Sequence, residues 1–388
     1  MTNMILNRNE TFWEEKSAWD TAHEISGQPR LWRVLADELT ERKDEIVSFM
    51  KQFKDRKDLR IAYTGAGSSA FIGESIQKIL ASELRLDSVT IHSPDVISDP
   101  EGELFDVPTL LVSYARSGES PESVGAIRKA QEYVHDLYNL VIVCKKDSSL
   151  DTYGRSLDKT LVLVMPEGSS DKGFAMTSSV SCMMLATYVV FGYEDFDERV
   201  AFLRDLADQA ERQMDEFDRQ VMKVAAFDYK RCVFLGLGGL KGLAHEGSIK
   251  TMELTNGEVA TNYEGSTGFR HGPKTIIDSE SLTVHLISDR PYTRIYDMDL
   301  LKEINNERKG NRTLAVVNRL YKEETSGTDY VITYESEAGK YTEMANYIFC
   351  LLVLQLLSLE KSIALGYTTD SPCAGGEVNR VVKGVIIY

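Results

Sequence analysis

The sequence predicts an α/β fold of two tandem domains, each with a mostly parallel sheet between layers of helices. Short apolar strands alternate with amphipathic helices along most of the chain, an order typical of parallel sheets. This pattern begins near residue 59 and starts again near residue 231. A length of 388 residues also exceeds what one core usually holds, so two domains are expected.

The first half contains four apolar runs that we expect to form strands, at residues 59–64, 109–114, 140–144 and 160–165. Residues 14–53 carry apolar side chains at helical spacing. Pro29 is expected to divide them into two helices, because proline lacks the backbone donor that a helix needs. The expected division is an N-terminal helical segment followed by two domains, at residues 1–40, 41–215 and 216–388 with a C-terminal tail.

The second half repeats the pattern after a charged helix expected at residues 195–226. Its strands are expected at residues 231–235, 282–287 and 313–317, and an apolar strand is expected at the C-terminus. Both halves open with a strand, a glycine turn and a helix, with GAGSSA at residues 65–70 and GLGG at 236–239. This repetition indicates an internal duplication.

Composition excludes several classes of function. The chain has 44 basic and 60 acidic residues, a net charge of −16, which argues against binding to nucleic acid. The most apolar stretch, residues 347–359, is shorter than the roughly 20 residues that cross a bilayer, so we expect a core helix and no membrane span. The N-terminus lacks the apolar run of a signal peptide, the five cysteines form no CxxC pair, and no cluster suggests a metal. We therefore expect a cytoplasmic protein with no metal and no cofactor.

The first glycine turn is a candidate phosphate site. Its Gly65-x-Gly67 pattern superficially matches a dinucleotide fingerprint, so a coenzyme is one alternative. Ser68 and Ser69 favour phosphate instead, because their hydroxyls and the free amides of the following helix can all donate hydrogen bonds. A second alternative is a structural turn with no ligand.

A second polar loop, RSGESPES at residues 116–123, is more specific. It places Arg116, Ser117 and Ser120 at the carboxyl end of a strand, where open α/β sheets bind ligands. Hydroxyls beside a helix N-terminus suit a phosphate monoester. The alternative is that Ser120 and Ser123 are only helix N-caps.

Two further segments each carry a polar residue for which the sequence allows two roles. Thr177, in the loop at residues 168–179, could cap the next helix or touch a sugar. Lys383 lies in an apolar C-terminal run, where its amine could reach a sugar carbonyl or a phosphate. The alternative for Lys383 is a surface lysine with a buried stem.

The second half supplies candidates for acid–base chemistry. Glu246 and Glu253 are seven residues apart, on one face of the helix expected at residues 244–254. Such pairs are usually solvated, but Glu253 is flanked by apolar residues, and partial burial suits a general base. His271 stands between arginine and glycine, where it is hard to bury, which makes it the best catalytic candidate among six histidines.

At this point four segments together resemble the sugar-isomerase (SIS) family over the whole chain, with two tandem SIS domains. They are TAHEI at residues 21–25 with Gln28-Pro29 and Trp32, RSGESPES, GFRHGP at 268–273 and GEVNRVV at 376–382. The chain looks most like the tagatose-6-phosphate ketose/aldose isomerases, also described as galactosamine-6-phosphate deaminase/isomerases. It is more distantly similar to the isomerase half of glucosamine-6-phosphate synthase.

The resemblance implies roles for individual residues. Phosphate would be held by Ser69, Ser117, Ser120 and the Arg116 backbone, with Gly67, Ser68 and Thr177 as further substrate contacts. Proton transfer would fall to Glu253, ring opening to His271 and the C-terminal lysine position to Lys383. The family shares its histidine across subunits, so a homodimer or higher homo-oligomer with a shared active site is implied. Departures from the synthase are Ala115 where it has serine, Phe269-Arg270 for Leu-Lys, and a longer loop between Glu253 and His271.

The implied activity is conversion of galactosamine 6-phosphate to tagatose 6-phosphate and ammonia by proton transfer between C1 and C2, on a hexose 6-phosphate substrate. One alternative is plain aldose–ketose isomerisation of a hexose 6-phosphate. Another is a non-enzymatic sugar-phosphate sensor, which the acidic charge disfavours.

Overall fold

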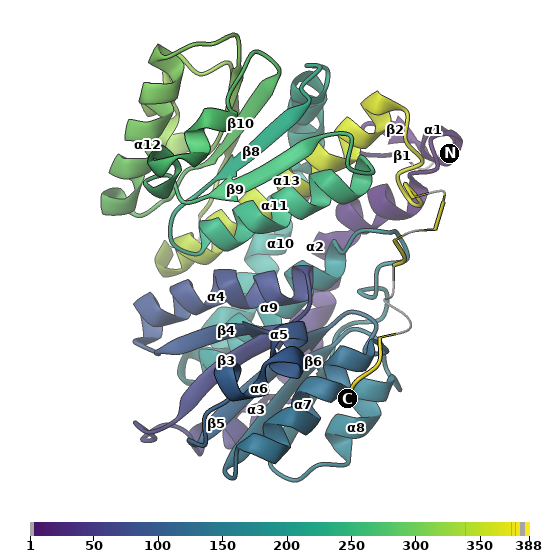
Figure 1. Cartoon of the computed structure of the whole chain (residues 1–388), viewed down its shortest axis with the longest axis vertical. Coiled ribbons are helices and arrows are strands. Elements are labelled where there is room, and N and C mark those ends of the chain that lie inside the picture. The colour runs from purple at the N-terminus through teal and green to yellow at the C-terminus, as the bar shows by residue number, and fades with distance from the viewer. Residues whose placement is uncertain (1–3, 338, 374, 377, 381–384) are drawn as a thin grey trace. The chain divides into compact units, whose positions relative to one another are not determined.

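The computed structural model describes residues 4–337, 339–373, 375–376, 378–380 and 385–388 (Figure 1). The chain forms two compact units. The unit that we call the sheet-1 unit comprises Arg30–Asp171, Ser178–Arg204 and Gly376–Tyr388. The sheet-2 unit comprises Met1–Pro29, Lys172–Thr177 and Asp205–Gly375. The α/β class is confirmed, and the domain boundaries at residues 40 and 215 remain predictions.

The sheet-1 unit is built on five parallel strands in the order β4-β3-β5-β6-β7. These strands are β3 (Arg60–Gly65), β4 (Ser88–His92), β5 (Thr109–Ala115), β6 (Leu137–Val143) and β7 (Thr160–Val164). The four expected strands are present, and β4 was missed because only one of its five residues is fully buried. Its polar residues Ser88, Thr90 and His92 interrupt the apolar Val89 and Ile91, so the strand lacks a continuous apolar run.

Helices cover both faces of this first sheet (Figure 1). On one face an apolar cluster joins the central strands to the helices α5 (Ser93–Ser98), α7 (Pro121–Tyr133) and α8 (Ser149–Arg155). The helices α4 (Ser68–Leu84) and α9 (Ser178–Phe191) pack against each other. Shorter or peripheral helices complete the unit, namely α3 (Lys43–Lys51), α6 (Pro100–Glu103) and the 3₁₀ turn η1 (Tyr193–Asp195).

The sheet-2 unit holds five parallel strands in the order β12-β11-β10-β8-β9. They are β8 (Arg231–Leu235), β9 (Ala260–Glu264), β10 (Ser281–Leu286), β11 (Arg312–Asn318) and β12 (Tyr330–Tyr334). In both sheets the second strand lies outside the first, and the third, fourth and fifth follow on its other side. This shared order supports the internal duplication inferred from the sequence.

Helices also cover both faces of the second sheet (Figure 1). Helix α12 (Pro291–Asn306) contributes to two apolar clusters on one face. Helix α11 (Leu240–Leu254) packs against α13 (Thr342–Leu365). The remaining elements are β1 (Met4–Ile5), β2 (Arg8–Asn9), α1 (Glu10–Glu15) and the 3₁₀ turns η2 (Gly268–His271), η3 (Pro273–Ile276), η4 (Arg319–Thr325) and η5 (Gly339–Tyr341). Two long helices, α2 (Trp19–Glu41) and α10 (Phe196–Ala225), include residues of both units.

The sequence led us to expect that Pro29 divides the N-terminal helix, and this prediction is wrong. Pro29 lies inside α2. A proline at this position leaves the carbonyl four residues earlier, that of Ile25, without its usual helical donor. The Gln28 side-chain amide donates to that carbonyl at 3.2 Å and also to Gln355 Oε1 at 2.8 Å. The helix therefore continues because a neighbouring side chain replaces the missing N–H.

The sequence predicts two apolar elements near the C-terminus, a core helix at residues 347–359 and a terminal strand, and their outcomes differ. Within the described residues, one helical stretch is long and apolar enough to cross a bilayer, Gly339–Leu365, and 83% of its most apolar window is buried inside the protein. This is the burial expected of a core helix. The predicted terminal strand is wrong for residues 385–388, which form no regular element.

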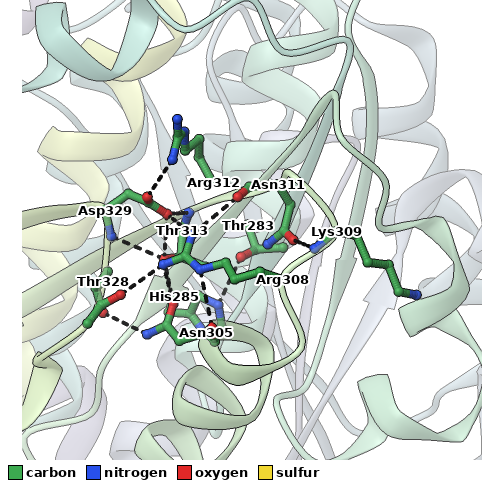
Figure 2. Close-up of polar contacts among 11 residues, drawn as sticks. Thr283, His285, Asn305, Arg308, Lys309, Asn311, Arg312, Thr313, Thr328 and Asp329 are labelled. Atoms are coloured by element: carbon green, nitrogen blue, oxygen red, sulfur yellow. Dashed lines mark hydrogen bonds and ion pairs between the residues drawn. The ribbon is translucent and has the colours of Figure 1, made fainter.

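A polar cluster ties the edge strand β12 to the rest of the second sheet (Figure 2). Asp329, just before β12, accepts hydrogen bonds from the Thr313 backbone at 2.8 Å and from Arg312 Nη1 at 3.0 Å. Arg308 donates to the same carboxylate and to the Gly327 carbonyl. These contacts explain how a strand with a weak apolar pattern is held in place, which sequence periodicity does not reveal.

The same region buries a histidine (Figure 2). His285, on the central strand β10, lies with its Nε2 at 3.1 Å from Thr283 Oγ1, and its Nδ1 has no hydrogen-bond partner among the described residues. Burial lowers the pKa of His285 from 6.5 to about 3, so the folded protein keeps the imidazole neutral. The unfolded chain takes up a proton below pH 6.5. The stability that this group contributes is thus present above pH 6.5 and is lost as the pH falls toward 3.

Replacing His285 with leucine should flatten the acid dependence of the free energy of unfolding. Between pH 6.5 and 3 the wild-type protein should lose about 1.4 kcal/mol per pH unit more than the variant. Urea unfolding at several pH values measures both slopes. Thr283→Val keeps the buried imidazole and should retain the steep slope, and parallel slopes for wild type and His285→Leu would contradict the assignment.

Candidate functional site

The first glycine turn lies where the strand order of the first sheet reverses. Strand β3 is flanked by β4 on one side and β5 on the other, so chains leaving β3 and β5 depart to opposite faces, and a ligand crevice is expected at the carboxyl edge between them. A Cβ at Gly65 would lie 2.7 Å from the Ser69 carbonyl carbon, so this position requires glycine. Gly67 has a φ of +55° and precedes α4. The turn thus brings the N-terminus of α4 to the crevice.

Ser68 and Ser69 form the first turn of α4, and both are buried. The Ser69 amide donates to the Ala66 carbonyl at 3.2 Å, which closes the turn tightly. A helix N-terminus that carries two hydroxyls is suited to an oxyanion, because the helix dipole and the hydroxyls both favour negative charge. This arrangement fits the predicted phosphate turn.

The second loop enters the same crevice from β5. Ser120 occupies the N-cap position of α7, but its hydroxyl makes no capping hydrogen bond. Ser117 Oγ accepts a hydrogen bond from the Glu119 amide at 3.2 Å. Both serines are partly exposed. The reading of Ser120 as only a helix cap therefore loses its support, and the hydroxyl remains able to contact a ligand.

Side chains beside the serines fix this loop. Glu119 accepts hydrogen bonds from Lys145 at 2.7 Å and from the Ser149 hydroxyl at 2.7 Å. The lysine contact lowers the pKa of Glu119, which keeps it ionised. A Cβ at Gly118 would lie 2.4 Å from Ser148 Oγ, so glycine is required here as well.

Arg116 engages the C-terminal segment. Its Nη2 donates to the Arg380 carbonyl at 2.7 Å, and its side chain is mostly buried. Arg380 in turn donates to the carbonyl of Asp171. The C-terminal segment thus joins two loops of the sheet-1 unit. Lys383, predicted as a site residue, lies outside the described residues.

Asp171 explains how helix α9 begins. Its carboxylate accepts hydrogen bonds from the Ser178 amide at 2.8 Å, the Ser179 amide at 3.1 Å and the Ser179 hydroxyl at 2.5 Å. A carboxylate is an effective N-cap, since it satisfies helix amides and favours the helix dipole. Asp171 therefore caps α9, a role that the sequence left open for Thr177. The contact of Thr177 with substrate remains a prediction.

Residues of the N-terminal motif hold the neighbouring part of this loop within the sheet-2 unit. Glu24 accepts hydrogen bonds from the amides of Lys172 and Gly173, the latter at 3.3 Å. Gln355 donates to the Thr177 carbonyl at 3.2 Å and receives the Gln28 amide. The motif that carries the family resemblance at residues 21–28 thus supports a loop.

In the sheet-2 unit, helix α11 carries three charged residues in contact. Lys250 Nζ lies 2.5 Å from Glu253 Oε2 and 3.8 Å from Glu246 Oε1. The side chains of Glu246 and Lys250 are 1% and 2% exposed, whereas that of Glu253 is 27% exposed. Of the two carboxylates, Glu253 is therefore the one that a ligand can reach. The sequence analysis missed Lys250, although its spacing of four and three residues from the glutamates was a readable signal.

His271 ends the 3₁₀ turn η2, and the following Gly272 has a φ of +128°. The histidine is exposed and makes no hydrogen bond or ion pair with another described residue. Each of the other five histidines makes a ring contact or a hydrogen bond with another residue, as His92 does with Glu74 and His245 with Tyr263. The imidazole of His271 is thus accessible, and its role in catalysis remains a prediction.

The described structure therefore places the predicted residues in two groups. At the carboxyl edge of the first sheet it gathers Gly67, Ser68, Ser69, Arg116, Ser117 and Ser120. In the sheet-2 unit Glu253 lies on α11 and His271 on η2. Among the described residues, no three His, Cys, Asp or Glu side chains form a group that could hold a metal ion. We call residues 65–70 and 116–123 the serine loops. Two open hollows of about 640 and 530 Å³ beside α3 and η1 share no residue with them.

The chain is similar to curated proteins over nearly its whole length. No family model matches the chain. The D-galactosamine-6-phosphate deaminase AgaS of Escherichia coli is 38% identical over 373 residues, 95% of each chain. AgaS of Shewanella sp. (strain ANA-3) is 34% identical over 392 residues, 100% of this chain and 96% of the relative.

Solved structures show the same fold. The tagatose-6-phosphate ketose/aldose isomerase from Escherichia coli superimposes with a TM-score of 0.84 at 34% identity, covering 95% of this chain and 96% of that one. The C-terminal domain of glucosamine-fructose-6-phosphate aminotransferase from Francisella tularensis shares the fold, with a TM-score of 0.74 at 18% identity over 89% of this chain and 96% of that one. The chain therefore belongs to the family of the AgaS D-galactosamine-6-phosphate deaminases, among the SIS-domain sugar-phosphate enzymes.

Proposed function

We propose that this enzyme converts galactosamine 6-phosphate to tagatose 6-phosphate and ammonia. The observation that carries the proposal is Glu253, a reachable carboxylate held by the buried Lys250 at 2.5 Å, in a chain 34–38% identical to D-galactosamine-6-phosphate deaminases. A proton must move from C2 to C1 of the sugar in this reaction. A carboxylate with a fixed position is suited to that transfer.

The phosphate of the substrate is assigned to the crevice of the sheet-1 unit. Ser69, Ser117 and Ser120 supply hydroxyls, and the N-termini of α4 and α7 supply amides and a favourable dipole. Binding the distal phosphate fixes the reacting carbons in place, and such positioning lowers the barrier to the chemical step.

The chemistry begins with opening of the pyranose ring. His271 is assigned the transfer of the proton from O1 to the ring oxygen, which leaves an aldehyde at C1. Glu253 then removes the C2 proton, which the adjacent carbonyl makes acidic, and the electron pair passes to O1, which takes a proton from water. The product of this step is an enolamine with a C1=C2 double bond.

Release of ammonia completes the reaction. Protonation of the enolamine at C1 by Glu253 moves the double bond to C2=N and regenerates the carboxylate. Water adds to the C2 imine, and ammonia leaves as the C2 carbonyl forms. The proposal includes a role for Lys383, a homo-oligomer with a shared active site, and a cytoplasmic location, as expected from the sequence.

The substrate should be identified by separate incubation with galactosamine 6-phosphate, glucosamine 6-phosphate and tagatose 6-phosphate. Ammonia and ketose released from galactosamine 6-phosphate support the deaminase. Formation of an aldose from tagatose 6-phosphate with no ammonia from either amino sugar would favour plain isomerisation, the activity named for the Escherichia coli isomerase structure.

Glu253→Gln should lower kcat about 10²–10⁴-fold, because the amide cannot accept the C2 proton. Binding of the sugar phosphate, measured by calorimetry, should persist. Glu258→Gln, at an exposed glutamate of the same unit, is the matched control and should keep wild-type turnover. Full activity in Glu253→Gln would refute the assignment.

Ser117→Ala and Ser120→Ala should each raise KM about 10- to 100-fold, since each removes a hydrogen bond to a charged phosphate. The value of kcat should change little. Initial-rate kinetics measure both. Ser156→Ala removes an exposed serine after α8 and should leave KM unchanged; equal KM values in all variants would exclude the serine loops from binding.

Lys250→Met should lower the free energy of unfolding by about 3–5 kcal/mol, because it leaves the carboxylate of Glu246, which is 1% exposed, without the lysine charge. Lys241→Met on the same helix breaks the ion pair with Glu264, whose side chain is 28% exposed while that of Lys241 is 47% exposed. This change should lower the free energy of unfolding by less than about 1 kcal/mol. Urea unfolding of both variants makes the comparison. Equal losses of unfolding free energy in the two variants would mean that the buried ion pair contributes no more stability than the exposed one.

A further inference from the structure

The segment that carries His271 is fixed at its start by one buried carboxylate. We call residues 265–272 the histidine loop. Ser266 Oγ in this loop donates to Asp297 Oδ1 at 2.6 Å, and the Ser288 amide, just after β10, donates to Asp297 Oδ2 at 3.2 Å. Ser266 and Asp297 are each only 1% exposed. One carboxylate on α12 thus joins the histidine loop to the carboxyl end of β10.

The rest of the loop also rests on α12. Phe269 is fully buried in one apolar cluster with Leu300 and Ile304. Arg270 Nε donates to Glu303 Oε2 at 2.6 Å. Positions 297, 300 and 304 recur at three and four residues along the helix, so they share one face. His271 follows these anchors directly, and its position is therefore set by α12.

The anchors differ in how strictly they fix the loop. Arg270 also pairs with Asp299 at 2.8 Å, but the Asp299 side chain is 68% exposed, and exposed ion pairs hold geometry weakly. Phe269 packs without a directional bond. The hydrogen bonds of Asp297 are buried and directional, and a buried hydrogen-bonded group tolerates little displacement.

We propose that Asp297 is a positioning residue for His271, acting through its hydrogen bond to Ser266 at the start of the histidine loop. The inference rests on the proposed function, in which His271 moves a proton during ring opening. Loss of the bond should misplace the imidazole without removing any group that binds the phosphate. The effect should therefore fall on kcat and spare KM.

Kinetics of Ser266 variants test this with little risk to folding. Ser266→Ala should lower kcat for galactosamine 6-phosphate about 10- to 100-fold, the loss expected from a misplaced catalytic group, with KM within twofold. Ser266→Thr keeps the hydroxyl and should recover most of the activity. Asp297→Ala should match Ser266→Ala, and Asp299→Ala, which removes the exposed partner, is the control that should keep wild-type kcat. Unchanged kcat in Ser266→Ala and Asp297→Ala would overturn the proposal.

A second readout needs no turnover. The imidazole resonances of ¹³C-labelled histidine report the environment of His271 directly. In Ser266→Ala the His271 signal should shift or broaden, whereas that of His135, in the sheet-1 unit, should not. An unchanged His271 signal would overturn the positioning role. If the wild-type protein releases no ammonia, only the proposed function is refuted. The His271 resonance would still test whether Ser266 and Asp297 position the histidine.

Discussion

The reversal of strand order beside the first strand of each sheet is the constraint on which the candidate site depends. In the first sheet, chains leaving β3 and β5 go to opposite faces, so the carboxyl edge between them cannot be covered by a connecting helix. The two serine loops follow β3 and β5 at that edge, and each leads into a helix N-terminus. Gly65 and Gly118 allow these loops to pack closely, since a Cβ at Gly65 would collide with Ser69 and one at Gly118 with Ser148.

Much of the remaining polar chemistry supports loops. Asp171 caps α9, Glu24 and Gln28 hold the loop at residues 172–177, and Asp297 holds the histidine loop. Each is a buried acceptor or amide that satisfies backbone or hydroxyl donors, which is the condition for placing polar groups inside a protein. The sequence motif at residues 21–28 is therefore better understood as scaffolding than as part of the reaction.

The sequence predicted the α/β class, the duplication and the central strands, because buried parallel strands are continuous apolar runs. It missed β4, β9 and β12, which are edge strands and lack such runs. The reading of Pro29 failed because the compensating donor, Gln28, acts through a side chain that no propensity describes. The serine candidates followed from loops at strand ends and Glu253 from a helix pattern, whereas the roles of Asp171 and Asp297 emerged only from three-dimensional contacts. The spacing of Lys250 from the two glutamates was readable in the sequence but was overlooked.

The chain enters and leaves each unit repeatedly, with junctions at residues 29/30, 171/172, 177/178, 204/205 and 375/376. Each unit is thus assembled from separated stretches of the gene, even though the two sheets repeat one topology. A single recombination breakpoint could not exchange one unit for a homologous one, because it would leave part of the incoming unit behind. After the ancestral duplication, the two halves would therefore have been inherited together, each accumulating changes in the presence of the other.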